Sequence, residues 1–288
     1  MNVETLRAAL WMIGAIIAFT AMAVAGRAAS LALDTFEIML FRSCVGLLIV
    51  LSCATYSGNL SNLITARPLL HLWRNLWHFT GQNLWFYAVT AIPLAQVFAL
   101  EFTTPLWVIV LSPLLLGERL TPIKALAAGM GFIGILIVAR PGASEISAGT
   151  LTAASCAIFF AFTFILTKRL TKTQSTTTIM FYLTATQLVF GLIAAGYDGQ
   201  ITLPDAASWP MLALVGACGL LAHFCIVNAL NIAPATIVAP IDFARLPVIA
   251  VVAMLLYNEP LEVWVFVGAV IIFAGNYLNI WTQTRNPA

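Results

Sequence analysis

Residues 92–120 read IPLAQVFALEFTTPLWVIVLSPLLLGERL, and residues 233–261 repeat this pattern as APATIVAPIDFARLPVIAVVAMLLYNEPL. The second copy begins 141 residues after the first, at position 233 instead of position 92. The matches at that offset include prolines and acidic residues: Pro93 with Pro234, Glu101 with Asp242, and Glu118 with Glu259. The chain is therefore predicted to contain two copies of one structural unit.

The composition indicates a membrane protein. Hydrophobic residues make up 61% of the 288 residues and charged residues only 8%. A water-soluble domain of this size cannot bury so much apolar surface. A helix needs about 20 residues to cross the hydrocarbon core. On that basis the sequence predicts ten transmembrane helices in an all-α membrane protein: 8–28, 35–56, 69–90, 94–116, 122–139, 147–168, 175–196, 208–230, 235–257 and 261–282.

Each copy holds five predicted spans, so the two copies enter the membrane with opposite polarity. We expect two inverted five-helix repeats, residues 1–143 and 144–288. Loop charges support this inversion, because one side carries eight Lys and Arg residues and the other carries two, Arg27 and Arg140. Positively charged loops stay in the cytoplasm. The expected location is thus the bacterial inner (plasma) membrane, with multiple spans and both termini in the cytoplasm.

The sequence argues against several other functions. The five cysteines lie in apolar segments without a CxxC pair, so neither a disulfide nor a metal site is expected. A GxGxxG pattern at Gly129, Gly131 and Gly134 falls inside a predicted span, which favours close helix packing over a dinucleotide cofactor. The net charge of +2 is too small and scattered for nucleic-acid binding. Clustered carboxylates, Walker sequences and charge rings are missing, which argues against an enzyme and an ion channel.

The two repeated blocks carry a family resemblance. The first copy contains Tyr87, Pro93, Glu101-Phe102, Pro105, Leu116-Gly117-Glu118-Arg119 and Arg140-Pro141-Gly142, and the second contains Pro234, Asp242-Phe243 and Asn258-Glu259-Pro260. This pattern resembles the EamA domain of the drug/metabolite transporter superfamily over essentially the whole chain. The resemblance implies ten helices in two inverted halves around a central cavity, and transport of a small metabolite. The stretch from Arg74 to Tyr87 is similar to a bacterial subgroup associated with riboflavin transporters.

The predicted span 69–90 carries a polar stripe that a lipid-facing helix would not tolerate. Its members lie within about 100° of one another on a helix: His71, Arg74, Asn75, His78, Gln82 and Trp85. The first two lie near the cytoplasmic end and fit either headgroup contact or the cavity, whereas His78 and Gln82 lie deeper and are expected to face the cavity. His223 matches Gln82 at the offset of 141 residues. The candidate substrate-binding residues are Asn75, His78, Gln82, Trp85, His223 and Asn228.

Charged residues inside the predicted spans form a second candidate set: Glu101, Asp242, Arg245, Arg42 and Arg74. A charge at mid-membrane costs roughly 2.5–3.5 kcal/mol on insertion scales, so each should be paired, protonated or hydrated. Asp242 and Arg245 are three residues apart and are expected to pair on one helix. Arg42 and Arg74 are the candidate partners of Glu101. The acidic residues either carry a coupling proton or pin helices together, and Glu118 and Glu259 are expected at solvated helix ends.

The sequence thus predicts a secondary transporter that moves a small polar metabolite by alternating access. An imidazole, an amide and an indole in one cavity suit a planar, polar-edged, largely uncharged solute, such as riboflavin or an aromatic amino acid. Export of amino acids or of a metal-chelating metabolite is the alternative. The expected partners are the small-molecule solute and the lipid bilayer. No cofactor or metal is expected, and both a monomer and a homodimer fit the sequence.

Overall fold

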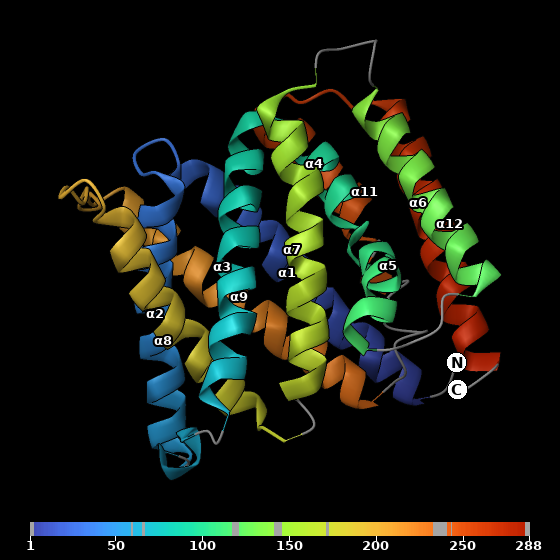
Figure 1. Ribbon diagram of the computed structural model, residues 1–288. Helices are drawn as coiled ribbons and strands as arrows, with labels where there is room; N and C mark the ends of the chain where they lie inside the picture. Colours follow the sequence, from blue (N-terminus) through green and yellow to red (C-terminus); the bar gives the residue numbers. More distant parts are fainter. Residues whose placement is uncertain are drawn as a thin grey trace.

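The computed structural model describes residues 3–58, 60–64, 67–116, 121–140, 146–170, 173–232, 241–242 and 244–285. All regular elements in these ranges are helices (Figure 1). They are α1 (Val3–Ala29), α2 (Thr35–Tyr56), the 3-10 helix η1 (Leu60–Leu63), α3 (Pro68–Ala91), α4 (Leu94–Glu101), α5 (Thr104–Leu116), α6 (Pro122–Ala139), α7 (Ala148–Leu170), α8 (Thr176–Ala195), α9 (Ser208–Ile232), α11 (Arg245–Tyr257) and α12 (Val263–Arg285). The predicted all-α class is confirmed. The predicted boundary at residues 143 and 144 lies outside the described residues, as do Glu118, Pro234 and Pro240.

The helices of the second half repeat those of the first at the offset seen in the sequence. Three pairs of helix starts are 141 residues apart: Thr35 and Thr176, Thr104 and Arg245, Pro122 and Val263. Packing follows the same relation, because α1 packs on α9 while α7, the counterpart of α1, packs on α3. In addition, α2 packs on its counterpart α8 at one side of the bundle and α6 packs on α12 at the other (Figure 1). A twofold relation between inverted halves produces this exchange of partners.

The predicted continuous span 94–116 is wrong, because the helix is broken in its middle. α4 ends at Glu101 and α5 begins at Thr104. Pro105 has no N–H to donate to the carbonyl of Glu101, four residues earlier. The Thr104 hydroxyl donates to that carbonyl instead, at 2.7 Å. In the second half Ala244 lies in a turn before α11, so this helix also begins at the position that matches the break. Broken helices are a recurring feature of transporter binding sites.

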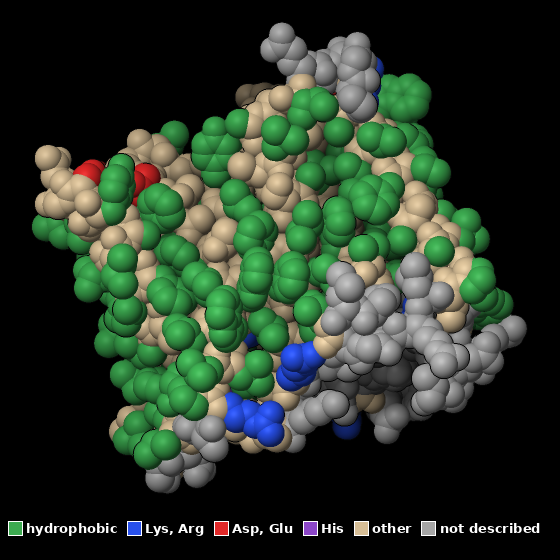
Figure 2. Space-filling view, in the orientation of Figure 1, with side chains coloured by type: hydrophobic (Ala, Val, Ile, Leu, Met, Phe, Trp, Pro, Cys, Tyr) green, Lys and Arg blue, Asp and Glu red, His purple; other side chains and the backbone are tan. Residues whose placement is uncertain are grey.

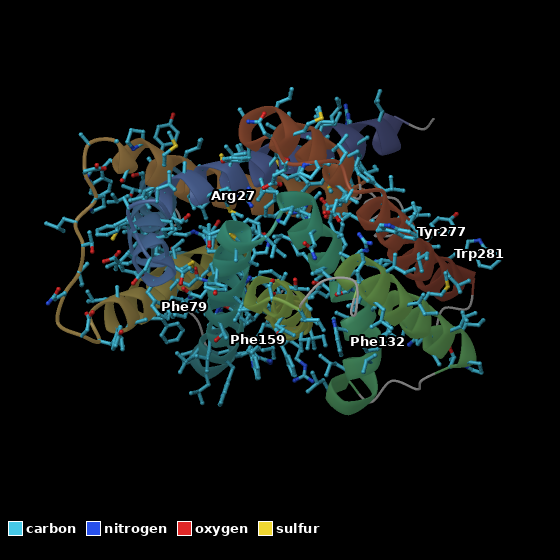
Figure 3. All side chains as sticks on the ribbon, turned by 90° about the horizontal axis from the view of Figure 1, so that it is seen from above. Arg27, Phe79, Phe132, Phe159, Tyr277 and Trp281 are labelled. Atoms are coloured by element: carbon cyan, nitrogen blue, oxygen red, sulfur yellow. The ribbon has the colours of Figure 1, made fainter. Side chains whose placement is uncertain are left out.

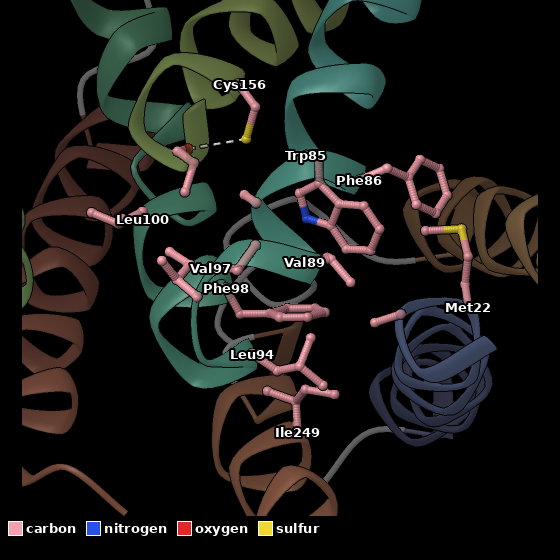
Figure 4. Packing of buried hydrophobic residues seen from close by; sticks show 14 of the residues in the cluster. Met22, Trp85, Phe86, Val89, Leu94, Val97, Phe98, Leu100, Cys156 and Ile249 are labelled. Atoms are coloured by element: carbon pink, nitrogen blue, oxygen red, sulfur yellow. Dashed lines mark hydrogen bonds between the residues drawn. The ribbon is translucent and has the colours of Figure 1, made fainter. Parts of the chain in front are cut away.

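The apolar core lies where α1, α3, α4 and α11 meet (Figure 4). Phe86 of α3 and Phe98 of α4 are fully buried there, together with Ile249 of α11. Gly26 lets α1 approach α3, because a Cβ at this position would lie 3.0 Å from Cδ1 of Phe86 and closer still to the next ring atom. Lipid tails provide no hydrophobic drive between helices, so close packing of this kind holds the bundle together.

The glycines of the GxGxxG pattern act mainly as packing residues. A Cβ on Gly134 would collide with Ile272 of α12 and would lie 2.9 Å from the backbone oxygen of Gly268. A Cβ on Gly131 would collide with Leu106 of α5. Gly129 differs, since a Cβ there would meet nothing within 4 Å. The expectation of close helix packing is therefore confirmed at two of the three positions.

The bundle has the surface of a multi-pass membrane protein. Seven described helical segments are long and apolar enough to cross a membrane, and the shorter stretches Arg245–Tyr257 and Val263–Leu278 are apolar as well. Hydrophobic side chains cover the flank that Figure 2 shows, while Lys and Arg residues gather at its lower end. The first and last helices, α1 and α12, have their chain ends on the same side of the bundle (Figure 1).

Candidate functional site

The polar stripe of α3 is buried inside the bundle. Its residues from the first turn of α3 to the middle of the helix are at most 5% exposed: His71, Arg74, Asn75, His78 and Gln82. His71 stacks on Tyr182 of α8 with ring centroids 4.6 Å apart. The neighbours of the stripe come from α2, α7, α8 and α9. The stripe therefore faces protein along this part of α3.

Two residues of the stripe tie α3 to its neighbours. Nε of Arg74 donates to the hydroxyl of Thr167 in α7 at 3.0 Å, and Nη1 donates to Oδ1 of Asn75 at 2.8 Å. Nδ2 of Asn75 in turn donates to the carbonyl of Tyr182 and to the hydroxyl of Thr186, at 2.8 and 2.6 Å. Both ends of the Asn75 amide are thus engaged by protein. This arrangement favours a helix-packing role for Asn75.

The middle of the bundle brings together residues that the repeat relates. Oε1 of Gln82 accepts a hydrogen bond from Nη1 of Arg42 in α2 at 2.7 Å. The rings of His78 and His223, from α3 and α9, have centroids 6.0 Å apart. His223 also contacts Phe19 of α1 edge-on, at 5.8 Å. Three helices, α2, α3 and α9, therefore place polar side chains close together.

A small pocket lies beside this point, between α2, α8 and α9. Its polar lining residues are Arg42, Ser43, Thr184, Gln187 and His223. In this conformation it has room for about one water molecule. Sequence reasoning missed the lining residues Ser43, Thr184 and Gln187. The signal that pointed to them was polar side chains within apolar spans, with Ser43 directly next to Arg42.

The charged residues of the two interrupted helices form one cluster. Nη2 of Arg245 lies 3.2 Å from Oε1 of Glu101 and 3.2 Å from Oδ2 of Asp242. The expected local pair of Asp242 and Arg245 is therefore present. The expected pairing of Glu101 with Arg42 or Arg74 is wrong, because Glu101 pairs with Arg245 from the other half. Spans that are distant in the sequence meet here, since α4 packs on α11.

Two other predicted substrate-binding residues, Trp85 and Asn228, already donate hydrogen bonds within the protein. The indole N–H of Trp85 donates to Oε2 of Glu101 at 2.8 Å, and its ring packs edge-on against Phe98. Trp85 is only 3% exposed, so its faces belong to the core rather than to an open stacking surface. Nδ2 of Asn228 donates to the carbonyl of Phe224 in the same helix at 2.9 Å.

A second ion pair closes the end of the bundle opposite the chain termini. Glu259 pairs with Arg27 of α1, and its Oε2 accepts from the backbone N–H of Leu94 at 2.8 Å. Arg27 also donates to the carbonyls of Val89 and Ile92, at 2.6 and 2.7 Å. Seen along the bundle, Arg27 lies among the helices rather than at the outer edge formed by α6 and α12 (Figure 3). The expectation that Glu259 is solvated at a helix end is therefore wrong.

Comparison with known proteins shows which family this chain resembles. The profile of the EamA-like transporter family matches residues 6–140 and again residues 147–281. The S-adenosylmethionine uptake transporter of Rickettsia bellii (strain RML369-C) is 26% identical over 276 residues, which cover 96% of this chain and 94% of that protein. The riboflavin transporter of Brucella anthropi is 30% identical over 211 residues, covering 72% of this chain and 74% of its own. The riboflavin transporter of Vibrio cholerae is 28% identical over 287 residues, covering 98% and 95%.

A solved crystal structure shares the fold, with a TM-score of 0.66 and 18% identity over 98% of this chain and 99% of the other. Both halves of the chain match one family profile, and the two matches cover nearly all of its length. The expected transport of a small-molecule solute by a non-enzymatic, multi-pass membrane protein is thereby confirmed. This chain belongs to the EamA-like transporter family.

Proposed function

We propose that this secondary transporter moves a small, ring-containing polar metabolite across the bacterial inner membrane by alternating access. The observation that carries the proposal is the buried polar cluster between the two halves, formed by Arg42, His78, Gln82 and His223. Polar and charged side chains inside a membrane are costly, and their usual role is to line a path for a solute or an ion. The repeat places Gln82 and His223 at matching positions, as expected for a site on the axis between two inverted halves.

Alternating access has a structural basis in the interrupted helices. The break between α4 and α5 lies directly after Glu101, which pairs with Arg245 at the start of α11. A broken helix supplies a hinge at the depth of the solute, so one half-helix can move while the other stays packed. The ion pair of Arg27 and Glu259 holds the end opposite the chain termini closed in this conformation. We infer that the two halves rock about the polar cluster, with this end opening as the other closes.

The chemistry around the cluster favours a solute with a planar ring. Four rings form a row of successive contacts, with centroids 5.8 to 6.0 Å apart, in the order Phe19, His223, His78 and Phe160. Such surfaces suit flat, polar-edged molecules. Riboflavin is the first candidate, in line with relatives that carry that name. S-adenosylmethionine, which contains an adenine ring and an amino-acid group, is the second candidate because of the similarity to the Rickettsia bellii protein.

The proposed orientation has both termini in the cytoplasm. The span ends and loops on that side carry eight Lys and Arg residues, whereas those on the other side carry two. A reporter enzyme fused to the C-terminus tests the orientation, because alkaline phosphatase is active only on the periplasmic side. Activity of such a fusion would overturn the proposed orientation.

Uptake by proteoliposomes tests the transport proposal. Purified protein is reconstituted, and the entry of labelled riboflavin, tryptophan and S-adenosylmethionine is measured with and without a pH gradient. Saturable entry of one of these solutes, reduced by its own unlabelled form and missing from empty liposomes, is the expected result. Entry of none of the three, from protein that remains monodisperse, would overturn the proposed solute class.

A further inference from the structure

Arg42 is a buried guanidinium group that has no carboxylate partner among the described residues. It lies in α2 and is 8% exposed. Nη1 donates to Gln82 at 2.7 Å and contacts the sulfur of Met39 at 3.6 Å, while the guanidinium lies 5.8 Å from the ring centre of Phe86. Within the part of the chain that the structure describes, none of these contacts brings a negative charge to Arg42.

Two other arginines of the bundle interior, Arg245 and Arg27, are neutralised by carboxylates. Among the described residues, the hydrogen bonds of Arg74 go only to the neutral side chains of Thr167 and Asn75. Arg245 lies 3.2 Å from each of two carboxylates and contacts three aromatic rings. Arg27 has Glu259 and two backbone carbonyls. A buried charge normally needs such a partner, because desolvation is expensive. Arg42 differs from Arg74 because it lines the pocket, so a counter-charge from outside the chain can reach it.

The pocket next to Arg42 contains a second unused donor. Gln187 of α8 lines this pocket and is 2% exposed, and its Nε2 has no hydrogen-bond partner. The hydroxyls of Ser43 and Thr184 already donate to carbonyls of their own helices, so their oxygen lone pairs remain available. The pocket is walled by glycines, and a Cβ on Gly219 would lie 2.7 Å from Nη2 of Arg42. The unsatisfied amide of Gln187 is thus a donor that requires an acceptor, and the charge of Arg42 favours an acceptor that is negative.

We propose that this pocket receives the carboxylate group of the transported solute. Arg42 provides two N–H groups in the fork geometry that fits the two oxygens of a carboxylate, and Gln187 donates an amide hydrogen to one of them. The ring of the same solute lies toward His78 and His223, next to the pocket. This inference rests on the proposed transport of a ring-containing solute, and it narrows that class to carboxylates. It therefore favours S-adenosylmethionine or an aromatic amino acid over riboflavin, which has no carboxylate.

Wild-type protein alone provides the first test. Proteoliposomes are given labelled tryptophan and S-adenosylmethionine in competition with unlabelled tryptophan, tryptophan methyl ester and riboflavin. The acid is expected to compete about tenfold to a hundredfold better than the ester, the loss expected when a charged hydrogen-bonding group is removed. Equal competition by acid and ester would overturn the carboxylate site. Transport of riboflavin without transport of either acid would also overturn it, yet would leave the proposed transport function intact. Transport of none of these solutes would refute both proposals.

Two substitutions locate the effect at the pocket. Arg42→Gln is expected to weaken competition by tryptophan by about tenfold to a hundredfold and to leave competition by the ester unchanged. Gln187→Glu brings a carboxylate to Arg42 from within the chain, so it is expected to block the acid and to raise the unfolding temperature in detergent. Inorganic phosphate, added as a competitor, distinguishes a general anion site from one fitted to a carboxylate. Unchanged acid-to-ester selectivity in both folded variants, or stronger competition by phosphate than by the acids, would overturn the proposal.

Discussion

The ion pair of Arg27 and Glu259 provides a sharp test of how the end opposite the chain termini is held closed. Glu259 accepts from Arg27 and from the backbone N–H of Leu94 at the start of α4. Arg27 lies 4.8 Å from the ring centre of Tyr257, whose hydroxyl donates to the carbonyl of Val24 at 3.2 Å. The Glu259 carboxylate thus joins α1, α4 and the end of α11, and Arg27 adds α3 through the carbonyl of Val89. Glu259→Gln keeps the size and one acceptor oxygen of the side chain but removes its charge.

The expected magnitude lies between two limits. Breaking a fully buried ion pair costs about 3–5 kcal/mol, whereas an exposed pair contributes about 0–1 kcal/mol. The side chains of Arg27 and Glu259 are 14% and 16% exposed, so solvent screens this pair only in part. The substitution also removes a negative charge from the N-terminus of α4, where it contributes about 0.3–1 kcal/mol. We expect the closed conformation to lose about 1–3 kcal/mol, which shifts its equilibrium with the open one by about 5- to 150-fold.

Spin labels on both sides of the pair measure this shift. Leu31 and Leu261 follow Arg27 and Glu259 closely in the sequence, and they are 89% and 45% exposed. With cysteines at these two positions in a background without native cysteines, electron paramagnetic resonance in nanodiscs gives the distribution of distances between the labels. Glu259→Gln is expected to add a population at longer distance, while the exposed neighbour substitution Glu262→Gln leaves the distribution unchanged. A distribution for Glu259→Gln identical to that of the wild type would refute the reasoning.

Three further predictions concern the site and the packing. Gln82→Ala and His223→Ala are each expected to reduce uptake about tenfold or more, which is the effect of losing one polar contact with the solute. Their gel-filtration profiles are expected to stay normal. Uptake equal to that of the exposed control Thr55→Ala would show that neither residue contacts the solute. Glu101→Gln is expected to abolish any stimulation of uptake by a pH gradient, and an unchanged stimulation would identify Glu101 as a structural pin. Gly134→Leu is expected to destabilise the protein by about 1–3 kcal/mol, because the new side chain must displace α12. The unfolding temperature measures this loss. Gly129→Leu, whose side chain would point into open space, is the control, and an equal fall in its unfolding temperature would contradict this explanation.

The sequence predicted the helices and their duplication well, because both are local properties of the chain. A membrane-crossing helix satisfies its own backbone hydrogen bonds, so length and hydropathy alone indicate where it lies. The predicted start at residue 35 agrees with the start of α2, and that at residue 122 agrees with the start of α6. The break after Glu101 was less accessible, because an interrupted helix is as apolar as a continuous one. Pro105 was the available signal, and only the hydroxyl of Thr104 shows how the freed carbonyl is satisfied.

The partners of the buried charges could not be predicted in the same way. The sequence indicated that Glu101 and Arg42 lie in the membrane, but it gave no means to choose among distant partners. Glu101 meets Arg245, 144 positions away, and Arg27 meets Glu259, 232 positions away. The packing of α4 on α11, and of α1 beside the end of α3, creates these encounters. The sequence by itself therefore determined an inverted pair of five-helix units, because hydropathy and internal repetition can be read from the order of the residues alone. Only the tertiary structure decided which of the buried cations lie beside a carboxylate, because Coulomb interactions depend on distances in space that separation along the chain does not encode.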